Sequence, residues 1–220
     1  FDAEGTTNLK ANPNYWEGAP GLAEVHVIAI PDGEARVQAL LTGQIDMNRY
    51  VPFAQKKIFD GNSKFNVSVV PTGNWRGMVM RTDTAPFDNP KVRKAVRLAV
   101  DRQELVDLVM GGAATVACDT PVAPSDQYRL NMKCGQDING AKKLLKEAGY
   151  PNGIEMTIHV STKEPTWPTI AEVMQQQLAK AGIKADIQMT PSKSYWKETW
   201  MKKAVAMTRW NERPADSALH

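Results

Sequence analysis

Residues 85–113 constrain the fold of this chain more than any other stretch, and they read APFDNPKVRKAVRLAVDRQELVDLVMGGA. Asn89 is a favourable N-cap residue, and Pro90 suits the first helical position because an N–H there has no intrahelical partner in any case. Four apolar residues then recur at the spacing of one helix face: Val92, Ala95, Val96 and Ala99. The pattern therefore predicts an amphipathic helix beginning at Pro90.

A second helix is predicted directly after the first. Asp101 and Glu104 have the spacing of a box-like N-terminal cap, and the pair Gly111 and Gly112 ends the helix. Its apolar face is expected to consist of Leu105, Leu108 and Val109. Periodicity alone thus predicts two packed helices joined by a turn.

Predicted strands and helices alternate along the rest of the chain. The strands are expected at residues 25–30, 45–47, 65–70, 74–82, 154–160, 183–189 and 204–210. The helices are expected at residues 53–59, 138–149, 169–181 and 192–203, with one more between Asp32 and Gly43. β-Branched residues occupy both odd and even positions of residues 25–30, and so both faces of a strand there. This favours a strand that is buried on both faces. This alternation indicates an α/β fold.

Composition excludes several classes of protein. Lysine and arginine number 27 against 24 acidic residues, and the basic residues form no dense run, so no nucleic-acid partner is predicted. No apolar run approaches the roughly 18 residues of a membrane span. The 2 cysteines and 3 scattered histidines supply no set of metal ligands, and no nucleotide, dinucleotide or hydrolase motif is present. We therefore expect no metal, no cofactor and no catalytic residue, and the chain is not predicted to be an enzyme.

Four motifs carry a family resemblance. They are NPNYWEGAP at residues 12–20, IPDGEARVQALLTGQID at 30–46, the PF…VRKAVRLAVDR segment at 86–102, and AKKLLKEAGYPNG at 141–153. In this order they resemble the extracytoplasmic solute-binding proteins of peptide, opine and nickel ABC importers, the family 5 proteins similar to dipeptide- and oligopeptide-binding proteins. The resemblance implies a periplasmic-binding-protein-like fold, with mixed sheets flanked by helices and a partial two-lobe structure.

The resemblance also implies an organisation and a function. Residues 1–82 are expected to form part of a first lobe, residues 83–207 most of a second lobe, and residues 208–220 the end of a crossover strand and the start of a missing C-terminal part. The expected role is capture of a peptide-like or other small polar solute between two lobes and its delivery to an ABC permease in the membrane. We expect a monomeric internal fragment of a periplasmic protein, with the signal peptide outside it. The alternative is a stand-alone α/β interaction or structural domain without a transport role.

Two segments correspond to the crossover strands that line the ligand cleft in this family. The candidate ligand-binding residues in them are Asn74, Trp75, Arg76, Arg209, Trp210, Asn211 and Arg213. Lys163 and Trp167 are added because family members often reach the ligand from this region. Simple packing within a strand is the alternative for Trp75.

One departure from the family pattern concerns the ligand. Peptide-binding members usually have an aspartate three residues after the crossover tryptophan, where it receives the α-ammonium group of the ligand. Here Arg213 takes that place, and a guanidinium prefers carboxylate or phosphate. The sequence therefore favours an anionic or otherwise modified solute, unless a shifted loop brings in Asp216.

The oxidising compartment that the resemblance implies favours a disulfide between Cys118 and Cys134. Such a bond would close a loop rich in proline and aspartate and stabilise it by about 3 kcal/mol. Two free thiols in a reducing compartment are the alternative.

Overall fold

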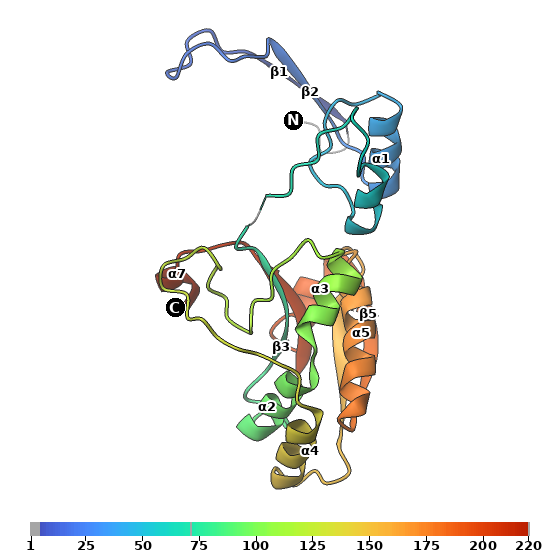
Figure 1. Cartoon of the computed structure of the whole chain (residues 1–220), viewed down its shortest axis with the longest axis vertical. Helices are drawn as coiled ribbons and strands as arrows, with labels where there is room; N and C mark the ends of the chain where they lie inside the picture. Colours follow the sequence, from blue (N-terminus) through green and yellow to red (C-terminus); the bar gives the residue numbers. More distant parts are fainter. Residues whose placement is uncertain (1–4, 71, 220) are drawn as a thin grey trace. The chain divides into compact units, whose positions relative to one another are not determined.

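The computed structural model describes residues 5–70 and 72–219 and divides into two compact units, Phe1–Val67 and Ser68–His220 (Figure 1). We refer to them as unit 1 and unit 2. Each contains helices and a sheet, so the fold is α/β, as the sequence predicts. Within the described ranges no helix is both long enough and apolar enough to cross a membrane.

In its described residues, unit 1 contains a two-stranded antiparallel sheet and two short helical segments. Strand β1 (Thr6–Lys10) pairs with β2 (Glu24–Ile28). Helix α1 (Gly33–Leu41) begins as predicted, because the Asp32 side chain accepts a 2.8 Å hydrogen bond from the Ala35 N–H. A 3-10 helix, η1 (Phe53–Ile58), follows it.

Of the three strands predicted in the first seventy residues, one forms as β2 but without the expected burial, and two do not form. Residues 25–30 were expected to be buried on both faces, yet Val27 is 50% and Ile28 47% exposed, because β2 pairs only with β1 and this two-stranded ladder leaves both faces uncovered. Residues 45–47 and 65–70 form no strand. Their alternation is correct for a strand, but neither run has a partner strand in the structure to bond with.

Unit 2 is built around a four-stranded sheet of order β3-β6-β4-β5. Its strands are β3 (Trp75–Met80), β4 (Ile154–Ser161), β5 (Ile183–Thr190) and β6 (Val205–Trp210). Strand β4 is parallel to both β5 and β6, and the edge strand β3 runs antiparallel to β6. The sheet is therefore mixed, with β6 and β4 in its centre.

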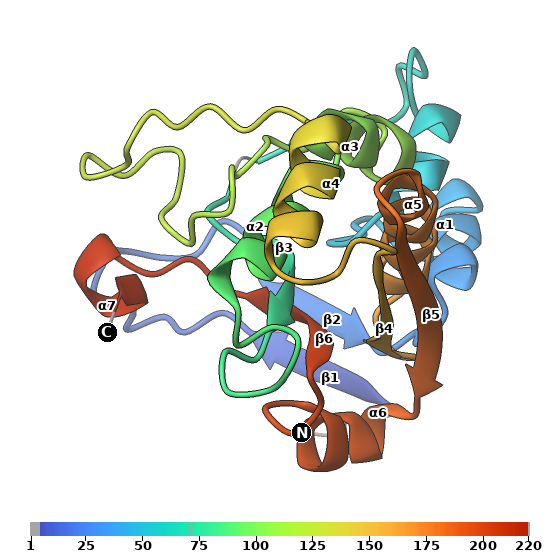
Figure 2. The same ribbon diagram turned by 90° about the horizontal axis from the view of Figure 1, so that it is seen from below.

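Helices pack on this sheet and on one another. They are α2 (Pro90–Ala99), α3 (Arg102–Met110), α4 (Ile138–Glu147) and α5 (Trp167–Lys180), followed by the short segments α6 (Ser192–Ser194), η2 (Tyr195–Thr199) and α7 (Ala215–Leu219). Helix α5 packs against β4 and β5, while α2 lies beside α4 (Figure 2). The expected helix at residues 192–203 is thus shorter and ends in a single π-helical turn.

The helix pair that dominates the sequence forms largely as predicted. The Asn89 side chain accepts a 2.9 Å hydrogen bond from the Lys91 N–H, and all four expected core residues of α2 are buried. Asp101 caps α3, and Gly111 ends it in the left-handed conformation. The expected apolar face of α3 is correct only in part, however, because Leu105 and Val109 are half-buried and Leu108 is not. Helix α3 packs against α5, which buries Val106 and Met110 and leaves Leu108 63% exposed.

A buried glutamine joins α5 to the start of α3. Gln177 is 1% exposed, and its Oε1 accepts a 3.0 Å hydrogen bond from the Asp101 N–H. Its Nε2 donates to the Asp101 carbonyl at 3.1 Å and to Glu104 Oε2 at 2.6 Å. This side chain satisfies the backbone at the break between two helices, where no helical hydrogen bond is available.

Two glycines meet where the parallel strands β4 and β5 begin. Gly153 has a φ of +88° and Gly182 a φ of +81°, and the Gly182 carbonyl accepts a 3.2 Å hydrogen bond from the Ile154 N–H. A Cβ on Gly153 would overlap the Gly182 carbonyl oxygen. The register of the two strands therefore begins at a contact that only glycine permits.

Candidate functional site

Most of the candidate residues gather at one edge of the unit 2 sheet. This edge is the one that runs across the strand ends. Because β4 and β6 are parallel and β3 is antiparallel to β6, the ends of β4 and β6 and the start of β3 lie together there. Ligands of open α/β sheets bind outside the carboxyl ends of parallel strands. This edge is therefore the natural place for a site.

The pairing of β3 with β6 puts the candidate residues on two faces. Trp75 lies opposite Trp210, and Arg76 lies opposite Arg209. Successive side chains of a strand point to opposite faces, so the two tryptophans share one face and the two arginines share the other. We call these the tryptophan face and the arginine face. The sequence groups these residues correctly by position along the edge but does not separate the two faces.

The arginine face holds two guanidinium groups and one carboxylate. Arg209 Nε lies 3.0 Å from Glu164 Oε1, in the loop after β4, and the Glu164 side chain is only 17% exposed. Although the Arg76 side chain as a whole is exposed, desolvation lowers its pKa, Glu164 opposes this shift, and the Arg209 charge adds to it. The three groups form one electrostatic cluster that keeps a net positive charge.

The tryptophan face carries the third arginine. The Arg213 guanidinium carbon lies 4.8 Å from the centroid of the Trp210 ring, which is the geometry of a cation–π contact. The Trp210 ring is in turn 6.4 Å, between centroids, from that of Trp200, and Trp210 stays 37% exposed. An arginine over an accessible aromatic ring offers charge and apolar surface side by side.

Trp167 does not reach this surface. It is 0% exposed and packs 5.5 Å, between ring centroids, from Tyr195. The Tyr195 hydroxyl donates to the Met207 carbonyl at 2.5 Å, and burial raises the pKa of Tyr195. Trp196 contacts both rings edge to face and continues the row toward Trp200. Trp167 therefore begins a row of packed rings that ends at Trp210.

The remaining candidates differ in role. Asn74 Oδ1 accepts a 2.8 Å hydrogen bond from the Glu212 N–H, and Glu212 Oε2 accepts a 2.9 Å hydrogen bond from the Gly73 N–H. This reciprocal pair ties the start of β3 to the segment after β6. Lys163 and Asn211 are exposed side chains at the same edge. Sequence reasoning missed Glu212, whose only signal was its place between two candidate residues.

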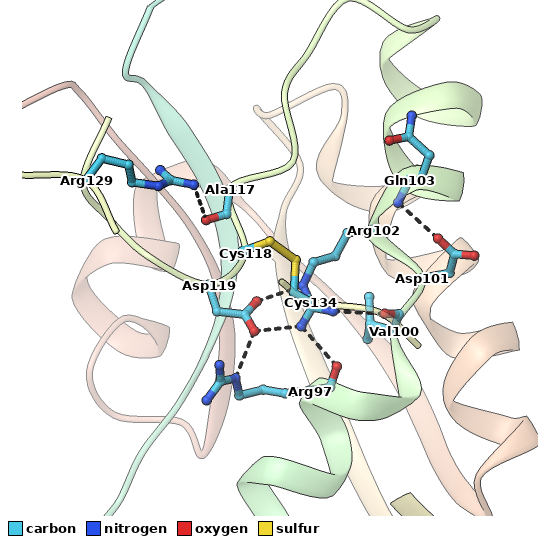
Figure 3. Close-up of a disulfide and its surroundings, with 10 residues drawn as sticks. All are labelled: Arg97, Val100, Asp101, Arg102, Gln103, Ala117, Cys118, Asp119, Arg129 and Cys134. Atoms are coloured by element: carbon cyan, nitrogen blue, oxygen red, sulfur yellow. Dashed lines mark hydrogen bonds and ion pairs between the residues drawn. A yellow bond between two sulfur atoms is a disulfide. The ribbon is translucent and has the colours of Figure 1, made fainter. Parts of the chain in front are cut away.

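The loop at residues 114–136 is closed by a disulfide (Figure 3). Cys118 and Cys134 are bonded, with their Cα atoms 5.3 Å apart. Next to the bond, Asp119 accepts hydrogen bonds from Arg102 Nη2 at 2.7 Å and from Arg97 Nε at 2.8 Å. The base of the loop is thereby fixed to α2 and α3.

Replacing both cysteines by serine is expected to lower the free energy of unfolding of unit 2 by about 3 kcal/mol, because the open loop of the unfolded chain gains entropy. Urea denaturation without reductant measures this difference. Reductant is expected to bring the wild type to the level of the double variant and to leave the double variant unchanged. A reductant effect of equal size on both proteins would contradict the role of the bond.

The described part of the chain offers no metal centre. No group of three or more histidine, cysteine, aspartate or glutamate side chains with the spacing to hold an ion occurs in the ranges that the structure describes. The side chains at this edge of the unit 2 sheet are instead aromatic rings, guanidinium groups and a carboxylate. Such a mixture serves binding by stacking and ion pairing.

The known proteins that this chain resembles are also binding proteins. Residues 1–218 match the family described as bacterial extracellular solute-binding proteins, family 5 Middle. The chain is 35% identical over 181 residues to the glutathione-binding protein GsiB of Escherichia coli K12, a match that covers 81% of this chain and 35% of GsiB. The chain thus spans about a third of the length of the curated relatives it matches.

Solved structures show the same fold. The periplasmic binding protein DppA from Helicobacter pylori, in complex with the peptide STSA, aligns with a TM-score of 0.79 and 28% identity, covering 99% of this chain and 42% of that protein. The ABC transporter substrate-binding protein CtaP from Listeria monocytogenes aligns with a TM-score of 0.85 and 22% identity, over 97% of this chain and 46% of that one. At that identity the second match speaks for the fold alone.

Proposed function

The chain belongs to the bacterial extracellular solute-binding proteins of family 5, and from this premise we propose that it binds a small peptide-like solute through a carboxylate group. The observation that carries the proposal is the concentration of Arg76, Arg209 and Arg213 at one sheet edge, beside an exposed tryptophan. Guanidinium groups bind carboxylates in bidentate geometry and cannot accept an ammonium group.

The named relatives support the class of solute. GsiB is a glutathione-binding protein, and the DppA structure holds a peptide. Glutathione is a tripeptide with two carboxylates and one ammonium group, so it matches a site in which cationic side chains predominate. We therefore choose it as the first probe.

Each residue has a proposed role. Arg213 binds a carboxylate of the solute, and Trp210 beneath it packs against the apolar part of the solute. Arg76 and Arg209 supply further positive charge from the arginine face, with Lys163 at its border. Trp167, which is buried, supports the aromatic row from inside and does not contact the solute.

The wider function follows from the family and forms part of the proposal. The protein closes two lobes around its solute and delivers it to an ABC permease, acting as a periplasmic monomer without catalysis. Residues 1–82 are assigned to the first lobe and to the crossover strand β3, which joins the unit 2 sheet, residues 83–207 to the second lobe, and residues 208–220 lead out of the second crossover strand. Closure requires a solute that binds the closed form more tightly than the open form.

Isothermal titration of the full-length protein with glutathione tests the proposal. We expect binding, and we expect Arg213→Asp to weaken it at least about tenfold, because it replaces an attractive charge by a repulsive one. At a hundred times the dissociation constant, glutathione should stabilise the wild type by about 2.7 kcal/mol in a thermal-shift assay.

Lys142→Asp is the matched control, since it makes the same change of charge on an exposed position of α4. Its affinity for glutathione should equal that of the wild type. Equal weakening of glutathione binding by both variants would indicate a general effect of net charge and would contradict a specific contact of Arg213 with the solute. If the wild type binds neither glutathione nor the peptide STSA, the proposed function is wrong.

A further inference from the structure

We propose that Asp126, in the disulfide-closed loop, is a positioning residue that holds Arg213 over Trp210 and thereby sets the affinity for the carboxylate of the solute. This inference rests on the proposed function and names a residue that does not itself reach the solute. The geometry that supports it lies entirely within unit 2.

Arg213 is exposed, yet both of its flanks are anchored. On one side, Glu212 is bonded to Gly73 and Asn74 at the start of β3. On the other side, Ala215 is 6% exposed, and its N–H donates a 3.2 Å hydrogen bond to Asp126 Oδ2. The position of the guanidinium therefore depends on two fixed points of the backbone.

Asp126 holds the second fixed point from outside the segment. Between Ala215 and Arg213 stands Pro214, whose ring fixes φ, so a shift of the Ala215 N–H moves Arg213 with it. The other carboxylate oxygen, Asp126 Oδ1, accepts a 2.8 Å hydrogen bond from the Tyr128 N–H within the loop. Both oxygens of this carboxylate are thus engaged, one locally and one across to the segment after β6.

The loop that carries Asp126 is braced. Arg129 donates hydrogen bonds to the Ala117 carbonyl at 2.8 Å and to the Val122 carbonyl. Ala123 is 3% exposed, and a Cβ on Gly73 would lie 2.6 Å from both the Ala123 Cβ and Glu212 Cδ. The loop, the start of β3 and the segment after β6 therefore meet in close contact at Gly73. A carboxylate on such a support can fix the segment that it bonds.

Asp126→Asn separates the two bonds of the carboxylate. An asparagine has one acceptor oxygen, so it can keep the local turn with Tyr128 while presenting an N–H₂ donor to the Ala215 N–H. We expect the affinity of the full-length protein for glutathione to fall about tenfold. In the Arg213→Ala background the same substitution should have no further effect, because a positioning residue acts only through the residue that it positions.

A measurement without ligand keeps the inference separable from the proposed function. The side-chain NMR signals of Arg213 should show the upfield ring-current shift of a group over Trp210, and Asp126→Asn should remove it. Asp119→Asn is the control: it is the same substitution in the same loop, but its carboxylate bonds Arg97 and Arg102, so the Arg213 signals should keep their shift.

The outcomes are distinct. If Asp126→Asn leaves the Arg213 shift unchanged, the inference is wrong whatever the protein binds. Equal loss of shift and affinity in both asparagine variants would also overturn it, since it would reveal only a loosened loop. If the shift changes as expected and neither glutathione nor the peptide STSA binds the wild type, the proposed function fails and the positioning of Arg213 stands.

Discussion

Gly153→Ala is expected to lower the free energy of unfolding of unit 2 by about 4 kcal/mol or more, which is the range of exceptionally damaging substitutions. The new Cβ would overlap the Gly182 carbonyl oxygen, a backbone atom that cannot turn aside as a flexible side chain can. That same carbonyl accepts the hydrogen bond from Ile154 that opens the pairing of β4 with β5. Urea denaturation followed by far-ultraviolet circular dichroism measures the loss.

Gly149→Ala separates the two sources of this cost. Gly149 has a φ of +91°, close to that of Gly153, but a Cβ there would meet no atom within 4 Å. The control should therefore lose only the roughly 1–2 kcal/mol of placing an alanine in the left-handed region. Equal losses at the two positions would show that conformation, and not the contact with Gly182, makes glycine necessary at 153.

Trp167→Ala carries the second large expected effect, a loss of about 3–5 kcal/mol in the free energy of unfolding of unit 2. Trp167 is the first residue of α5 and is fully buried at the start of the aromatic row, so its removal leaves a cavity beside Tyr195 and Trp196. Equilibrium unfolding in urea, monitored by circular dichroism, gives the difference.

Two further variants make this result specific. Trp167→Phe should be much milder than the alanine variant, because it keeps most of the ring volume and the Trp167 Nε1 finds no hydrogen-bond partner within the described part of the chain. Trp16→Ala, at an 82% exposed position, should change stability by no more than about 0.5 kcal/mol. If Trp167→Ala is as harmless as Trp16→Ala, the buried packing of Trp167 is wrong.

Helix α2 shows what the sequence can predict. Its N-cap, its proline and its apolar stripe are local signals, and all of them agree with the structure. Which face of a helix is buried is harder to predict. In α3, Val106 and Met110 are buried although Leu105, Leu108 and Val109 are equally apolar, because the contact with α5 selects the buried face. That contact joins distant parts of the chain and is not encoded in the spacing within α3.

Burial is harder still to predict where a strand has few neighbours. Val25, Val27 and Ile28 have the composition of a core strand and are exposed, because composition gives the preference of a residue but not what covers it. The candidate site shows the same division. The resemblance to a family pointed to the candidate residues at the start of β3 and the end of β6. It did not show the separation into two faces, the burial of Trp167 or the contribution of Glu212, because these depend on strand register and side-chain packing.

The pairing of β3 with β6 has a consequence for the order in which the chain can assemble. Strands β4 and β5 are joined by one helix and lie close in sequence, so their pairing is fairly local. Trp75 of β3, in contrast, pairs with Trp210 of β6, which lies far along the sequence. Closing so long a loop costs entropy before any contact repays it, so non-local pairing is slow. During synthesis from the N-terminus, β3 therefore stays unpaired until β6 has followed β4 and β5, and the candidate site at the ends of β3 and β6 is the last part of this four-stranded sheet to form.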